Sequence, residues 1–142
     1  MPFPQLARYL WASPASALGL VAALLLWPFG ARARCVGGTV EIALRRVPRF
    51  VARRFGAITL GHVVLGVDFG TLDRLRAHEQ VHVRQYERFG PLFIPLYLGD
   101  SAWQWLRGRD AYRDNRFERE ARARRPALLR SRARAQAQAK SR

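Results

Sequence analysis

Two histidines and a glutamate stand at a spacing that suits metal chemistry in the segment His78-Glu79-Gln80-Val81-His82. Residues four apart on an α-helix point the same way, one turn apart, so both imidazoles can reach one ion. Imidazole nitrogens are common zinc ligands, at distances of about 2.0–2.1 Å. Glu79 lies about 100° around the helix from His78, which suits contact with a metal-bound water better than ligation. The pattern predicts a Zn²⁺ site with Glu79 as general base.

The plainer interpretation is that these residues fell by accident on an amphipathic helix. The chain has 3 histidines, and two of them lie here, on the face that turns inward. Burying both without a metal would require two separate hydrogen-bonding arrangements. We therefore favour the metal site. The expected chemistry is peptide hydrolysis, in which a zinc-activated water loses its proton to Glu79, which later delivers it to the leaving amine.

A catalytic zinc needs a third protein ligand and an open fourth position. Glu118 and Glu120 are the downstream candidates. They lie on opposite sides of a predicted helix, so only one of them can face the ion. The spacing alone leaves the choice between them open.

A His-Glu-x-x-His helix followed by a helix with Glu-x-x-Ala resembles the gluzincins, which include thermolysin and membrane-bound peptidases that process prenylated proteins. The resemblance covers roughly residues 57–124, with residues 115–121 fitting the second motif. It implies Glu118 as the third ligand, a zincin-like core, and an edge strand, here residues 57–65, to which a peptide adds through backbone hydrogen bonds. The stretch HEQVHVRQYERFGPLF is also similar to small bacterial membrane proteins.

One position departs from the gluzincin pattern. Gluzincins commonly place an aspartate four residues after the ligand glutamate, where it orients the first histidine, and this chain has Arg122 there. Such outer partners tune a metal site strongly. Asp110, Asp114 or Glu120 could substitute, and the sequence does not choose among them.

Other side chains near the motif have plainer roles. His62 falls on one face of a predicted strand and is expected to be a packed or rim histidine. Tyrosine hydroxyls could donate to an oxyanion that develops on the scissile carbonyl, but we favour packing for the candidates Tyr86, Tyr97 and Tyr112. Trp103 and Trp105 are expected to be core or interface anchors.

Apolar periodicity predicts the elements that must position these residues. Asp73 can cap a helix in which apolar and histidine positions recur every three or four residues, and Gly90-Pro91 can end it. The sequence predicts helices over 73–88, 92–106 and 111–124 and short strands over 39–44 and 57–66. We expect an α+β fold, mostly helical, with a small hairpin or sheet and a three-helix zincin-like core in residues 32–124.

An uncharged segment from Tyr9 to Ala31 precedes this domain. A helix there could just span a bilayer, which needs about 17–25 apolar residues. We expect an N-terminal transmembrane anchor over residues 1–31, with a cleaved signal peptide as the alternative. Because only Arg8 precedes the segment and many arginines follow it, the positive-inside rule places the domain on the cytoplasmic side of a bacterial inner membrane.

The formal charge of +15, from 25 basic and 10 acidic residues, would attract anionic lipids or nucleic acid. All basic residues but Lys140 are arginine, a bias typical of genome composition, and no nucleic-acid recognition motif is present. Residues 125–142 are expected to form a basic disordered tail. Cys35, the single cysteine, is expected to be an inert thiol. The expected partners are membrane lipids and a peptide or membrane-protein substrate. The alternative is a non-catalytic, zinc-stabilised, membrane-associated interaction domain.

Overall fold

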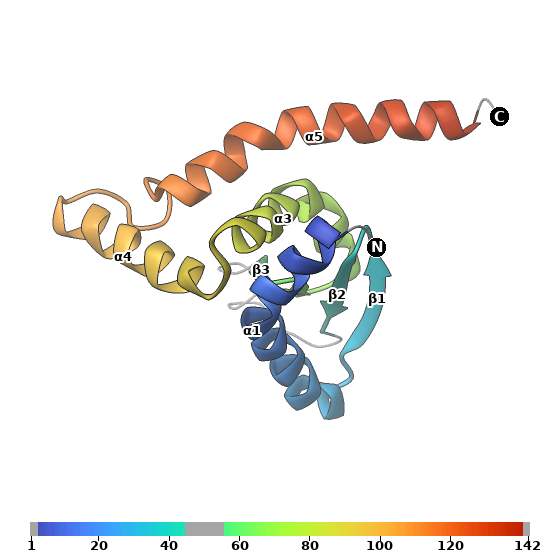
Figure 1. Ribbon diagram of the computed structural model, residues 1–142, viewed down its shortest axis with the longest axis horizontal. Coiled ribbons are helices and arrows are strands. Elements are labelled where there is room, and N and C mark those ends of the chain that lie inside the picture. The colour runs from blue at the N-terminus through green and yellow to red at the C-terminus, as the bar shows by residue number, and fades with distance from the viewer. Residues whose placement is uncertain (1–2, 45–55, 141–142) are drawn as a thin grey trace.

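A computed structural model describes residues 3–44 and 56–140 of the chain (Figure 1). The α-helices are α1 (Phe3–Leu26), α3 (Phe69–Phe89), α4 (Phe93–Leu106) and α5 (Arg116–Lys140), and two short 3-10 helices are η1 (Trp27–Phe29) and η2 (Gly90–Leu92). The strands are β1 (Arg32–Val36), β2 (Thr39–Ala43), β3 (Ala57–Leu60) and β4 (Val63–Gly66). The predicted α+β class, with an apolar N-terminal helix and a small sheet, is confirmed.

The four strands form one mixed sheet in the order β1-β2-β4-β3. Antiparallel pairing joins β1 to β2 and β3 to β4, while β2 and β4 run parallel. The sheet is therefore larger than the predicted hairpin, and β3 forms one of its edges. The strand β1 was not predicted, because its alternating Arg32 and Arg34 do not read as an apolar strand face.

Residues 57–66, predicted as one strand, form a tight hairpin instead. Gly61 has φ of +61°, and a Cβ at this position would lie 2.2 Å from Ser16 Oγ. Only glycine fits a left-handed turn pressed this closely against another helix. His62 therefore lies in the turn between β3 and β4 and not on a strand face.

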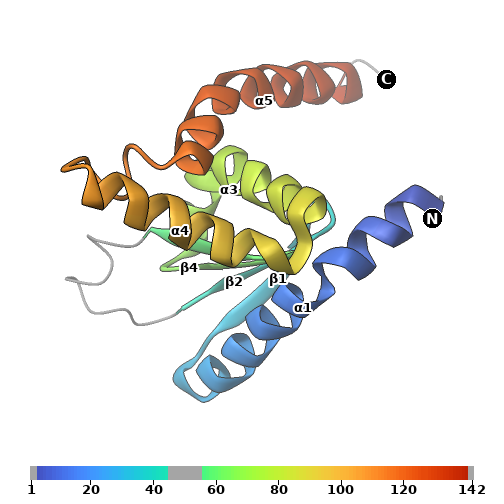
Figure 2. The same ribbon diagram turned by 60° about the vertical axis from the view of Figure 1, so that its left-hand side comes forward.

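Helices α1 and α3 cover opposite faces of the sheet (Figure 2). Ile42 and Val63 pack toward α1, while the neighbouring Ala43 and Val64 pack toward α3, as expected because successive strand residues face opposite ways. Leu72 and Val83 of α3 are buried in the same cluster as Ala43 and Val64 and complete the core on this side. The sheet thus holds α3, and with it both histidines, in a fixed position.

The N-terminal helix packs on the domain along one side. A Cβ at Gly19 would lie 2.6 Å from Val63 Cβ, so the helix backbone rests directly on β4, and Ala12 and Ala15 are buried on the same side. Among the described residues, the segment Gln5–Phe29 is long enough and apolar enough to cross a membrane. A signal sequence or a core helix meets the same criterion. The opposite side of α1 exposes large apolar residues, among them Leu18, Leu20, Val21, Leu24 and Leu25.

The helix that carries the His-Glu-x-x-His motif begins at Phe69, four residues earlier than predicted. Asp68, and not Asp73, caps α3: its Oδ1 accepts from the backbone N–H of Thr71 at 2.7 Å. Asp73 instead lies within the helix, where it forms ion pairs with Arg34 and Arg76. The predicted end at Gly90 and the predicted helix over 92–106 agree with the structure.

Helix α5 begins at Arg116 because Asn115 caps it. The Asn115 side chain accepts from the backbone N–H of Phe117 at 2.9 Å and donates to Tyr97 O at 3.0 Å, which ties the first turn of α5 to α4. Residues 111–115, predicted as helix, form turns. At its other end α5 continues through Lys140, beyond the helix predicted to end near 124, because alanine and arginine favour helix strongly. The basic segment 45–55 lies outside the described residues.

Candidate metal centre

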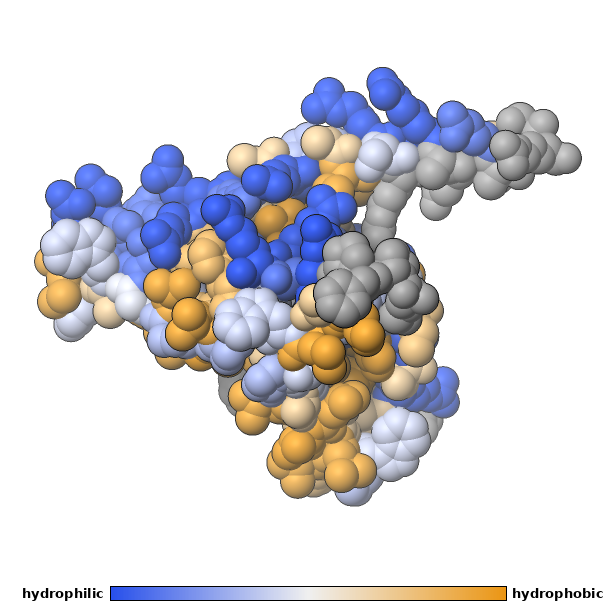
Figure 3. Space-filling model, in the orientation of Figure 1, coloured by the Kyte–Doolittle hydropathy of each residue, from blue (hydrophilic) through white to orange (hydrophobic). Residues whose placement is uncertain are grey.

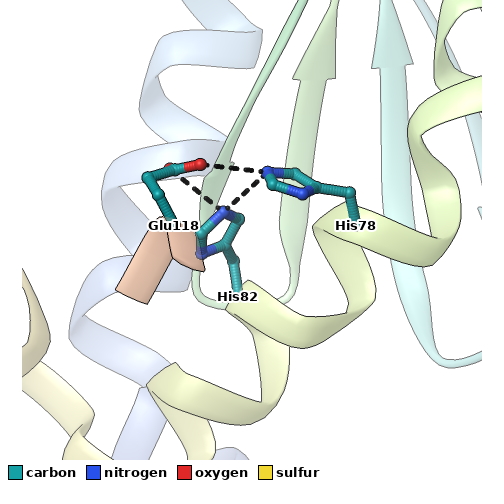
Figure 4. A group of neighbouring side chains, drawn as sticks. All are labelled: His78, His82 and Glu118. Carbon is teal, nitrogen blue, oxygen red and sulfur yellow. Dashed lines mark hydrogen bonds and ion pairs between the residues drawn. The ribbon is translucent and has the colours of Figure 1, made fainter. Parts of the chain in front are cut away.

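Three polar side chains from two helices converge on one buried point (Figure 4). His78 and His82 project from α3, and Glu118 projects from the first turn of α5. The two Nε2 atoms lie 3.1 Å apart, and each lies 3.3 Å from an oxygen of Glu118. The three residues that the sequence and the gluzincin resemblance select as ligands are thus brought together.

The donor set fits a metal ion. One ligand atom from each residue lies within 4.8 Å of the other two. Glu118 Oε2 is buried without a hydrogen-bond partner among the described residues, and facing imidazole nitrogens need a proton or a cation between them. Atoms at these separations can each lie about 2.0–2.2 Å from a single ion. The buried group could therefore hold a metal ion.

Gln85 orients the second histidine. Its Oε1 lies 2.8 Å from His82 Nδ1, while its Nε2 donates to Phe117 O at 3.2 Å and to Glu120 Oε2 at 2.9 Å. Because the amide nitrogen has these two acceptors, the amide oxygen faces the imidazole and accepts from Nδ1–H. In the neutral ring, Nε2 then carries a lone pair directed at the other two ligands.

The charges of the site favour an ionised carboxylate at its centre. Burial raises the pKa of Glu118, but its interactions with His78, His82 and Tyr97 outweigh burial and hold the pKa well below its usual range. Burial lowers the pKa of His82, yet Glu118 and Glu79 produce a net rise. Because a protonated imidazole cannot ligate a metal, metal binding should weaken at low pH.

Tyr97 supports Glu118 directly. Its hydroxyl donates to Glu118 Oε1 at 2.8 Å. Burial, together with the negative charge of Glu118, raises the pKa of Tyr97, so the phenol stays a donor. The prediction that this tyrosine only packs, with its hydroxyl at the surface, is wrong. Tyr86 does pack: it is buried against Phe93, and burial raises the pKa of Tyr86 to about 12.

Glu79 is buried beside the ligands and is held by the sheet. Thr59 on β3 donates its hydroxyl to Glu79 Oε2 at 2.6 Å. Both His78 and Glu79 line the same cavity, and neither Glu79 oxygen takes part in the group that could hold the ion. His78 and Glu79 thus face the same cavity from neighbouring positions, and His78 alone of the two belongs to the group that could hold the ion.

A cavity of about 340 Å³ opens onto the three ligands. Its walls come from β3, from α3, and from α4 with the turn that follows it, and most of the lining is apolar. The side chains that line it include Ile58, Leu60, Phe93, Ile94, Leu98 and Tyr112. A space of this size beside a metal site can receive a few residues of an extended chain.

The remaining acidic candidates lie away from the ligand group. Glu120 bonds to Gln85 and to Arg124, so it reaches His82 only through the amide. Asp110 and Asp114 form hydrogen bonds within the turn 110–114. Arg122 donates to Arg113 O and lies 4.0 Å from Glu118 Oε2. These residues therefore do not supply the aspartate expected beside the first histidine, His78, whereas Gln85 orients the second histidine, His82.

Two supporting residues were missed by sequence reasoning. Gln85 lies three residues after His82 on the same helix face, and this spacing could have identified it. Thr59 carried no signal, because its contact with Glu79 depends on the position of β3 against α3. His62 is packed, as expected: it stacks on Tyr9 and lies 3.2 Å from Glu87.

Comparison with protein-family models, with curated proteins and with solved structures finds no match for this chain.

Proposed function

We propose that this protein is a membrane-associated, zinc-dependent metallopeptidase of the gluzincin type. His78, His82 and Glu118 would hold the ion. The observation that carries the proposal is the convergence of these three buried ligands at the floor of a cavity that also contains an unligated glutamate. Zinc, when bound, supplies a Lewis acid that polarises a carbonyl and makes a water molecule more acidic.

Glu79 is the general base. Its carboxylate accepts the proton of the attacking water and delivers it to the leaving amine. The hydrogen bond from Thr59 fixes one carboxylate oxygen and leaves the other to take the proton. The pKa of Tyr112, raised to about 12 by burial and by Glu118, keeps that phenol protonated, so it can donate to an oxyanion on the substrate.

The edge strand β3 binds the substrate backbone. It borders the cavity, and in the sheet order its outer edge has no partner strand among the described residues. An extended peptide can add to such an edge through main-chain hydrogen bonds. The apolar lining beside β3 favours apolar substrate side chains.

The helix α1 attaches the enzyme to a membrane. It is long and apolar enough to cross one, and its outer side exposes leucines and valine that the other described residues leave uncovered. The arginines that follow α1 favour the cytoplasmic side of a bacterial inner membrane for the cavity. Peptides and neighbouring membrane proteins are then the substrates within reach.

The test separates metal binding from turnover. We expect Glu79→Gln to retain its zinc, measured by mass spectrometry of the purified full chain, and to lose at least about 100-fold in hydrolysis of fluorescein-labelled casein. His78→Ala and Glu118→Ala should lose the metal as well. Glu87→Gln is the control, since this helix residue contacts His62 and does not line the cavity.

Two results would contradict the proposal. If the purified wild type contained no zinc, the proposed metal site would be wrong. If the wild type held zinc but neither it nor any variant hydrolysed casein, the result would instead favour the zinc-stabilised interaction domain.

A further inference from the structure

Helix α4 turns its polar residues toward the protein. Asp100 accepts from the backbone N–H of Arg116 at 2.7 Å, and Ser101 accepts from Asn115 Nδ2 at 2.8 Å. Gln104, on the next turn, is buried with 9% of its surface exposed. Asp100 and Ser101 therefore face the start of α5. The polar face of α4 is thus used inside the molecule.

Large apolar residues from Leu98 onward on the same helix face outward, whereas Phe93 in its first turn is buried. The exposed fractions are 60% for Leu98, 55% for Trp103, 69% for Trp105 and 70% for Leu106. A helix on the surface of a soluble protein normally has the reverse arrangement, with its apolar face packed on the core. Contiguous exposed apolar residues of this size mark a contact with another apolar phase or partner.

The residues that follow indicate which partner. Arg107 lies over the ring of Trp103, 5.3 Å from its centroid, and Arg109 comes two residues later. Tryptophan beside arginine is the typical pattern at a membrane interface, where the ring lies at headgroup depth and the guanidinium contacts lipid phosphates. An anionic lipid surface complements the charge of these arginines wherever they lie on it. A protein partner would have to place an acidic residue opposite each of them.

The length of α4 determines how it meets the lipid. Its 14 residues are too few to cross a bilayer, which needs about 20, so it would lie along the surface. The exposed side of α1 is also apolar, and Figure 3 shows apolar residues gathered over α1 while hydrophilic ones cover α5. The molecule thus has a second apolar element besides the helix that could cross the membrane.

We propose that α4 is a second membrane-contacting element, with Leu98, Trp105 and Leu106 embedded in the surface of an anionic bilayer. Leu98 also lines the cavity. The mouth of the metal site therefore opens at the lipid surface, and the substrates are apolar chain segments that emerge from a membrane. The substrate statement rests on the proposed peptidase function, whereas the lipid contact of α4 does not.

Tryptophan quenching in vesicles tests the lipid contact. Two double variants of the full chain are each reconstituted into vesicles of brominated phosphatidylcholine and phosphatidylglycerol. Trp11→Phe/Trp27→Phe retains the tryptophans of α4, and Trp103→Phe/Trp105→Phe retains those of α1 and η1. We expect lipid bromine to quench α4 emission by at least twofold, with little quenching by aqueous iodide. Quenching confined to the second variant would overturn the α4 contact and leave the α1 attachment standing.

A labelled cysteine gives a second measurement that does not depend on replacing packed tryptophans. In a Cys35→Ser chain, Leu106→Cys carries an environment-sensitive fluorophore, and Leu129→Cys on α5, exposed by 48%, is the matched control. Quenching by lipid bromine at the first site and not at the second is expected. Equal quenching at both sites would overturn the proposal in favour of non-specific adsorption. Protection of the fluorophore from iodide without quenching by lipid bromine would overturn it in favour of a protein partner.

Discussion

The amide of Gln85 does for His82 what a carboxylate commonly does in zinc enzymes. A carboxylate partner makes the imidazole more basic and fixes its tautomer. An amide fixes the tautomer equally well, provided that its own nitrogen is held, and here Phe117 O and Glu120 hold it. The neutral partner adds no charge to the three ligands, so it should yield a weaker site than a direct carboxylate.

Replacing Gln85 should therefore loosen the metal more than the fold. Gln85→Leu removes the hydrogen-bond partner of His82 Nδ1 and the amide donor to Glu120, and we expect zinc affinity to fall about 10–100-fold, with a loss of about 1–3 kcal/mol in unfolding free energy. Competition with a chelating dye measures the first effect, and urea denaturation of the detergent-solubilised chain measures the second.

The double exchange Gln85→Glu/Glu120→Gln is the control. It returns an acceptor to His82 and a donor amide to the neighbouring position, so affinity should recover to the wild-type level or exceed it. Equal zinc affinity in Gln85→Leu and wild type would show that His82 needs no partner.

Among the elements, α3 depends most on how its first turn is capped. Asp68 accepts from the backbone N–H and from the hydroxyl of Thr71. Because of these bonds, and of Arg74 nearby, the pKa of Asp68 lies below its ordinary value of 3.8. A charged cap at a helix N-terminus also interacts favourably with the helix dipole.

Capping by Asp68 predicts a pH-dependent difference between variants. Since its pKa is lower in the folded chain, its charge contributes stability above the unfolded value and loses this contribution as pH falls through the folded value. Asp68→Ala should cost about 1 kcal/mol at neutral pH. Asp68→Asn, which keeps an acceptor, should cost less, and the difference between wild type and Asp68→Asn should shrink as the pH falls from neutral to below the folded pKa of Asp68, which lies under 3.8. Urea denaturation at both pH values measures this. A constant difference would place the cap elsewhere.

Elements held by local patterns could be predicted, and those held by distant contacts could not. The helical spacing of His78 and His82 and the Glu-x-x-Ala motif at Glu118 are local, and they identified the three residues that the structure brings together. The Gly61 turn depends on its contact with α1, and Thr59 depends on β3 lying against α3. The periodicity of the sequence carries no information on either contact, so the sequence predicts one strand where the structure has a hairpin.

At the scale of the molecule, charge and apolar surface are separated. Helix α5 beyond residue 124 is exposed and basic, while α1 and α4 expose apolar side chains (Figure 3). Beyond the first turns of α5, Arg125 donates a hydrogen bond to Arg74 O of α3 at 3.4 Å. The metal centre needs α5 only through its first turns, where Phe117 and Ala121 are buried.

Removing residues 125–142 should separate the chemistry from the charge. The deletion takes away the basic residues Arg125, Arg130, Arg132, Arg134, Lys140 and Arg142 and no acidic one, which lowers the formal charge from +15 to +9. Zinc content and casein hydrolysis should stay within about twofold of wild type, since surface changes typically alter stability by less than about 0.5 kcal/mol. Binding to duplex DNA should weaken, and its dependence on salt should become shallower. If the arginines rather than the metal carried the main activity, the shortened chain would lose that activity while keeping its zinc.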